Sequence, residues 1–162
     1  MPSIPWDTIG YWTEIKLDII RKYAVAYATI MAQQRNIRRF GYIDAFCGPG
    51  VHVSKQTGEF VHGSPLNALL IQPQFSAYHF IDIDGDKASA LRKLAGAHER
   101  VQVQQAAVRE RDVRLHAARH DRRGDLGVVV VLDHEAARRR VRRGEAGERV
   151  PERQVSVAGE RR

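Results

Sequence analysis

The aromatic side chains of this chain are confined to its first half, which restricts where a hydrophobic core can form. All 12 Phe, Trp and Tyr residues lie between Trp6 and Phe80, and from residue 101 onward there is also no isoleucine or methionine. Burial of large apolar side chains is the main term that offsets the loss of chain entropy on folding. We therefore expect the packed core within residues 1–104, with only Val, Leu and Ala available beyond it.

The charge changes at the same place. Residues 1–100 carry a net charge of +2 and residues 101–162 carry +5, and all 15 basic residues of the second part are arginine. This composition has three interpretations: an arm that binds nucleic acid, a solvated low-complexity tail, or a translated stretch that was never selected as protein. Arginine with Ala, Gly and Val is also what a GC-rich coding sequence tends to give when it is read out of frame.

Several classes of protein are excluded by what the chain lacks. Its longest aliphatic run is residues 128–132, whereas a membrane span needs about 20 apolar residues. The first ten residues have neither a basic start nor a continuous apolar run, so they do not resemble a secretory signal. The single cysteine, Cys47, excludes an internal disulfide framework and a cysteine-based zinc site. We expect one cytoplasmic domain with no membrane partner and no bound metal.

A long helix is predicted near the N-terminus. Apolar residues recur at spacings of three and four over residues 11–31, which is typical of a helix with one buried stripe. Asp7 or Thr8 is expected to cap its start. The residues predicted to form the buried stripe are Trp12, Ile15, Ile19, Ile20, Tyr23, Tyr27, Ile30 and Met31.

Alternating strands and helices follow. Strands are predicted at 40–46, 78–83 and 101–103, helices at 64–71 and 86–94, and a hairpin or loop at 51–63. Ser64 is expected to cap the first of these helices, with Pro65 at its first position, and Ala88, Leu91 and Leu94 are expected to point inward. This order is the βαβ pattern of a parallel sheet, which residues 128–132, followed by Asp133, would continue.

The turn after the first strand carries the clearest chemical signal. Asp44 to Gly50 read Asp-Ala-Phe-Cys-Gly-Pro-Gly, and glycines at the carboxyl end of a parallel strand allow close approach of a ligand. The turn lacks the third glycine of the dinucleotide fingerprint and the Lys-Ser/Thr of a phosphate-binding loop, so a pyrophosphate cradle is disfavoured. We expect a ligand with a cationic amino-acid group, with Asp44 accepting from its ammonium.

A second carboxylate, Asp82, directly follows the next strand. Two acceptor oxygens at this position suit the paired hydroxyls of a ribose. Asp84 and Asp86 are expected to cap the following helix instead. The alternative for both Asp44 and Asp82 is a turn-forming or capping role without a ligand. Cys47 is interpreted as a small buried thiol in preference to a nucleophile, because the sequence places no base beside it.

The motifs together resemble one known family. The segments that carry the resemblance are 11–17 (Tyr-Trp-Thr-Glu-Ile-Lys-Leu), 44–50, 57–59 (Thr-Gly-Glu), 63–66 (Gly-Ser-Pro-Leu) and 79–84 (His-Phe-Ile-Asp-Ile-Asp). Over residues 6–104 the chain is similar to the three-Cys-motif partner proteins, which have a class I methyltransferase-like fold. The resemblance implies S-adenosylmethionine as cofactor, a partner that carries three cysteines, and a cofactor site made of Asp44, Phe46, Gly48, Gly50 and Asp82.

The second half departs from that family. A carboxylate is expected after the third strand, but Val103 is followed by Gln-Gln-Ala-Ala, and the Asp-Pro-Tyr-like segment expected after the fourth strand is reduced to Asp133 followed by His134. We therefore expect an α/β protein with an N-terminal helical segment (1–40), half of a Rossmann-like sheet (41–104) and an arginine-rich, poorly structured tail (105–162). The expected function is a truncated methyltransferase-like protein, with a nucleic-acid-binding protein or an inactive fragment as alternatives.

Overall fold

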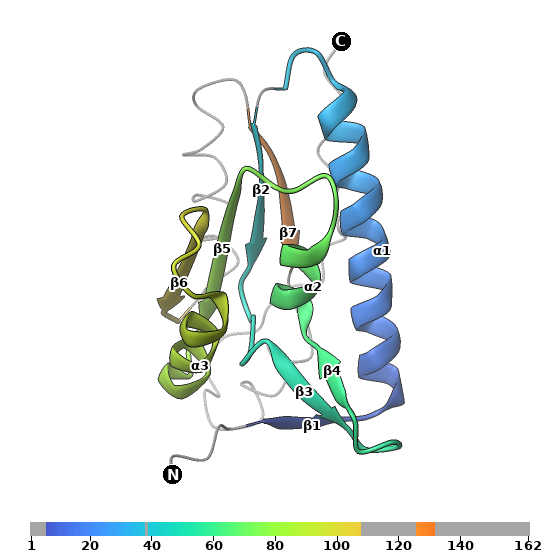
Figure 1. Cartoon of the computed structure of the whole chain (residues 1–162), viewed down its shortest axis with the longest axis vertical. Coiled ribbons are helices and arrows are strands. Elements are labelled where there is room, and N and C mark those ends of the chain that lie inside the picture. Colours follow the sequence, from blue (N-terminus) through green and yellow to red (C-terminus); the bar gives the residue numbers. More distant parts are fainter. Residues whose placement is uncertain (1–5, 38, 108–125, 132–162) are drawn as a thin grey trace, which may run out of the picture.

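The computed structural model describes residues 6–37, 39–107 and 126–131 (Figure 1). The helices in this part of the chain are α1 (Tyr11–Gln33), α2 (Ser64–Leu70) and α3 (Gly85–Ala95). The strands are β1 (Asp7–Ile9), β2 (Arg39–Asp44), β3 (Val51–Ser54), β4 (Phe60–His62), β5 (Ala77–Asp82), β6 (Val101–Gln105) and β7 (Leu126–Val131). The predicted alternation of strands and helices is confirmed, with boundaries that differ by a few residues.

The larger sheet is parallel throughout and has the order β6-β5-β2-β7. β5 and then β6 lie on one side of β2, and β7 pairs with the opposite edge of β2. In that pairing Tyr42 is in register with Val129. The mixed α/β class and the parallel pairing are therefore confirmed. The strand predicted at 128–132 is β7, which begins two residues earlier and ends one residue earlier.

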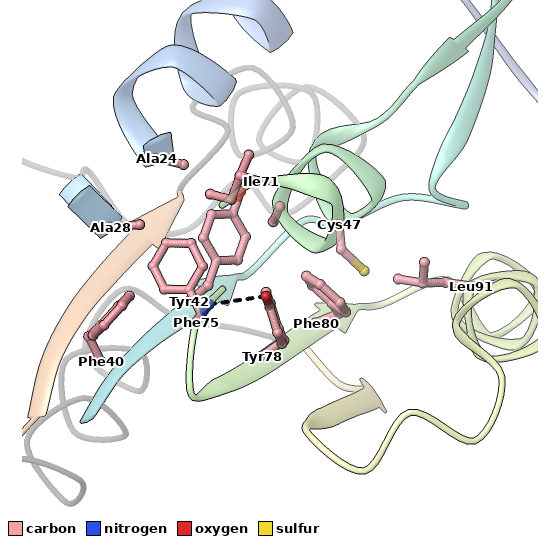
Figure 2. Packing of buried hydrophobic residues seen from close by; sticks show 11 residues of the cluster. Ala24, Ala28, Phe40, Tyr42, Cys47, Ile71, Phe75, Tyr78, Phe80 and Leu91 are labelled. Atoms are coloured by element: carbon pink, nitrogen blue, oxygen red, sulfur yellow. Dashed lines mark hydrogen bonds between the residues drawn. The ribbon is translucent and has the colours of Figure 1, made fainter. Parts of the chain in front are cut away.

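Three helices pack on one face of this sheet. Phe40 and Tyr42 of β2 and Tyr78 and Phe80 of β5 point to the same face, since side chains alternate along a strand. The helices contribute Ala24, Ala28, Ala68 and Leu91 to the same buried cluster, with Cys47, Ile71 and Phe75 completing it (Figure 2). Figure 2 shows the Tyr78 hydroxyl accepting a hydrogen bond from the Phe75 backbone N–H, which anchors the aromatic centre of the core.

A small second sheet lies beyond the carboxyl ends of the parallel strands (Figure 1). β3 and β4 form an antiparallel hairpin, and β1 pairs in parallel with β3 through contacts such as Thr8 with Val53. Of the two expectations for residues 51–63, the hairpin is confirmed. The predicted cap of α1 is wrong, because Asp7 and Thr8 belong to β1 and Gly10 occupies the N-cap position without a side-chain hydrogen bond.

The predicted buried stripe of α1 is confirmed only in part, since Ile20, Tyr27 and Met31 are partly buried against the core. Its buried residues are Leu17, Ala24 and Ala28, whereas the Trp12 side chain is 75% exposed. Ile19, Tyr23 and Ile30 are exposed as well. Small residues at helical spacing allow a helix to approach a sheet closely, so α1 turns its alanines toward the core and several of its bulky side chains away from it.

Two smaller expectations about the other helices also change. Gly63, not Ser64, is the N-cap residue of α2, with proline in the first turn as predicted. Ala88 and Leu91 of α3 are buried as expected, but Leu94 is exposed. Asp84 is the N-cap residue of α3, as predicted, and its side chain accepts from the backbone N–H groups of Asp86 and Lys87.

The tail predicted for residues 105–162 lies outside the described residues except for 105–107 and 126–131, and so does Asp133. Within the described ranges, no helix combines the length and the apolar character that crossing a membrane requires.

Candidate functional site

The turn after β2 needs glycine at two positions. Gly48 and Gly50 have φ values of +63° and +86°, a region that side-chain-bearing residues rarely adopt. A Cβ atom on Gly50 would lie 2.9 Å from Cδ1 of Leu91 in α3. The backbone conformation of the turn therefore explains both glycines, and the close approach of α3 is a second reason for glycine at position 50.

The hairpin of β3 and β4 lies between this turn and α2, and the two ends of the segment meet. The Gly63 N–H donates to the Gly50 carbonyl at 2.8 Å, so the residue before α2 touches the end of the glycine turn. A strand, a glycine turn and a helix thus come together in space although thirteen residues, 51–63, separate them in the chain.

Asp44 ends β2 and is only 1% exposed. Its Oδ2 accepts from the Ser64 hydroxyl at 2.5 Å, and its Oδ1 accepts from the Phe46 N–H at 3.2 Å. These bonds join the end of β2 to the first residue of α2. The structure therefore places Asp44 inside the protein, where it connects the end of β2 to the start of α2. Its expected contact with a ligand ammonium stays a prediction.

Asp82 ends β5 and is partly exposed. Its Oδ2 accepts from the Gly48 N–H at 2.9 Å, which lies across the sheet edge in the turn after β2. Its Oδ1 accepts from the Asp84 N–H, also at 2.9 Å. A carboxylate offers about four lone-pair positions, so these two bonds leave Asp82 able to accept further donors.

Phe46 and Cys47 occupy the middle of the same turn. Phe46 is half-buried, and the buried Cys47 donates its backbone N–H to the Ile81 carbonyl at 3.2 Å. Burial raises the pKa of the Cys47 thiol well above its usual range, and the nearby charges of Asp44 and Asp82 raise it further. A thiolate nucleophile is disfavoured in such surroundings, so the interpretation of Cys47 as a small buried thiol is confirmed.

His52 belongs to this site although the sequence did not single it out. A Cβ atom on Gly48 would lie 3.5 Å from its Cε1, and one on Gly63 would lie 3.0 Å from its Nε2, so the ring lies against both glycines. Burial lowers the pKa of His52, and its buried Nδ1 has no hydrogen-bond partner within the described structure. Its position two residues after Gly50 was the available signal.

An ion pair connects the small sheet to α3. Lys87 Nζ lies 2.6 Å from Oδ2 of Asp7, so β1 is held near the start of α3. Within the described residues, no three His, Cys, Asp or Glu side chains are grouped as a metal site would require.

The sequence matches no protein-family model, and comparison with curated proteins finds no significant similarity. The resemblance to three-Cys-motif partner proteins therefore stays a prediction that rests on the motifs themselves.

Proposed function

We propose that this chain binds S-adenosylmethionine at the carboxyl ends of β2 and β5, as a methyltransferase-like protein similar to the three-Cys-motif partners. The observation that carries the proposal is the bond from the Gly48 N–H to Asp82, which joins the glycine turn to a partly exposed carboxylate on the neighbouring strand. A glycine turn and an acidic residue so arranged form the usual cradle for a nucleoside with a ribose diol.

The strand order supports the same site. β2 has β5 on one side and β7 on the other, and the direction in which the chain adds strands reverses at β2. Ligands of doubly wound α/β proteins bind outside the carboxyl ends of the strands at this reversal. A Rossmann-like, methyltransferase-like fold is the finer description that we propose for the parallel sheet.

The residues of the turn fit such a cofactor. Asp82 keeps acceptor capacity for the ribose hydroxyls, Gly48 and Gly50 present backbone without side chains, and Phe46 lies half-buried beside them. Asp44 contributes by holding the start of α2 through Ser64. When bound, S-adenosylmethionine would supply an activated methyl group, and the protein's part would be to orient donor and acceptor.

Titration calorimetry of the whole chain tests this proposal. Asp82→Ala should weaken the binding of S-adenosylmethionine by about 1.5–3 kcal/mol, the usual worth of a hydrogen bond to a charged group. Asp86→Ala is the matched control, because it removes a nearby exposed carboxylate that does not contact the glycine turn. Equal affinity in all three proteins, or binding of NAD in place of S-adenosylmethionine, would exclude the assignment.

The resemblance also implies a protein partner with three cysteines. We propose this partner on the motifs alone, and co-purification of the two co-expressed proteins is its test. Recovery of this chain without such a partner under those conditions would count against it.

A further inference from the structure

A groove separate from the glycine turn runs between α1 on one side and β4 and α2 on the other. Its volume is about 340 Å³, and its wall residues include neither Asp44, Asp82 nor the glycines of the turn. Leu17 and Val61 give it an apolar part. Its other wall residues are Glu14, Asp18, Arg21, Phe60, His62 and Asn67.

The two acidic side chains of this groove, Asp18 and Glu14, differ in their partners. Asp18 forms ion pairs with Arg21 at 2.8 Å and with Lys22 at 2.7 Å, so the only arginine of the groove already has an acidic partner. Glu14 differs, because its Oε1 is buried without a hydrogen-bond partner in the described structure. An unpaired buried carboxylate oxygen is unfavourable, so the groove favours an added donor with positive charge over an anion.

The remaining wall residues suit a cation on an apolar stem. Phe60 is 69% exposed, and its ring is held in an edge contact with Trp6 at 5.8 Å between centroids. An aromatic face of this kind attracts an ammonium group. Glu14 lines the groove, and the last torsion of a glutamate side chain is soft, so its carboxylate can reorient toward such a ligand.

We propose that this groove binds an alkylammonium group, either of a free alkyl amine or of a lysine side chain in a peptide. Glu14 pairs with the ammonium, Leu17 and Val61 contact the stem, and Phe60 covers the cation. The inference does not depend on the proposed cofactor site, because the two sites share no residue.

Nuclear magnetic resonance titration of the full chain tests the inference, with n-butylamine and N-acetyl-lysine-N-methylamide as probes. Both should shift the side-chain amide signals of Asn67, and the tighter-binding probe identifies the free amine or the peptide as the natural source. Glu14→Gln should weaken binding at least about tenfold, as expected for loss of a charge-assisted hydrogen bond. Glu59→Gln, an equal change at an exposed carboxylate outside the groove, should leave binding unchanged.

Phe60→Ala provides a second variant that leaves the carboxylate intact, and it should weaken binding several-fold without unfolding the protein, since Phe60 is exposed. Three results would overturn the proposal: neither probe binds, 1-butanol binds as tightly as n-butylamine, or Glu14→Gln and Glu59→Gln bind alike.

Discussion

Asp44 and Asp82 end adjacent parallel strands, and yet the structure gives them different surroundings. Asp44 is fully buried and bonds to the Ser64 hydroxyl and the Phe46 N–H. Asp82 is partly exposed and bonds to two backbone N–H groups, one of them in the turn that follows Asp44. Two identical side chains at equivalent ends of neighbouring strands therefore differ in what they can still bind.

The difference follows from the two segments after the strands. Beyond β2, the hairpin carries the chain away and returns it at Gly63, so that α2 starts directly over Asp44. Beyond β5, the chain enters α3 within three residues, and Asp84 supplies the cap. Asp44 is thus covered by a returning segment, whereas Asp82 stays at the surface where the two turns meet.

Replacement of each aspartate by alanine should separate the two roles, and Asp44→Ala carries the largest expected effect. It should lower the free energy of unfolding by about 3 kcal/mol, because it leaves the Ser64 hydroxyl and the Phe46 N–H without their acceptor in the interior. Asp82→Ala should cost only about 1 kcal/mol, since water can reach its donors. Urea unfolding of both variants measures these free energies. Equal decreases for the two variants would contradict the different roles assigned to the two aspartates.

Two glycine-to-alanine variants sharpen the description of the turn between these carboxylates. Gly50→Ala should lower the free energy of unfolding by about 2–3 kcal/mol, because it combines a strained positive φ with a close approach to Leu91. Gly58 also has a positive φ, +72°, but an added Cβ there would meet open space. Backbone strain alone should therefore lower the free energy of unfolding of Gly58→Ala by about 1 kcal/mol. Thermal unfolding of the pair is the measurement. Similar losses would mean that α3 does not press on the turn.

The smallest expected effect concerns His52, whose ring lies against the glycine turn. Burial lowers the pKa of His52 in the folded protein, so the unfolded chain binds a proton more readily than the folded one. Stability should therefore fall as the pH drops below the ordinary histidine pKa of about 6.5. His52→Gln should show a smaller decrease in urea unfolding between pH 7 and pH 5. An unchanged pH dependence would show that the ring is not buried against the turn.

Much of the parallel sheet was predictable, because β2 and β5 are short, largely apolar runs that end in aspartate and β7 is a run of valines. The capping role of Asp84 and the burial of Cys47 were also predictable, because each follows from the type of residue and its place next to a predicted strand or helix. Which side chains of α1 are buried was not predictable. Periodicity indicates that a helix has apolar residues at helical spacing, but it does not show which side of the helix packs against the sheet. Ala24 and Ala28 give a weak hydrophobic signal, and yet they are the residues of α1 that are fully buried in the core cluster.

The sequence by itself determined the α/β alternation, the glycine turn and the restriction of aromatic packing to residues 6–80, since these follow from side-chain type and local spacing. Only the tertiary structure decided that Asp44 is enclosed, that Asp82 reaches Gly48, and that His52 and Gly63 join the turn. These contacts join residues that lie between 4 and 34 positions apart, and most of them depend on how the hairpin folds back and on how β5 aligns with β2. Local propensity carries no information about either arrangement.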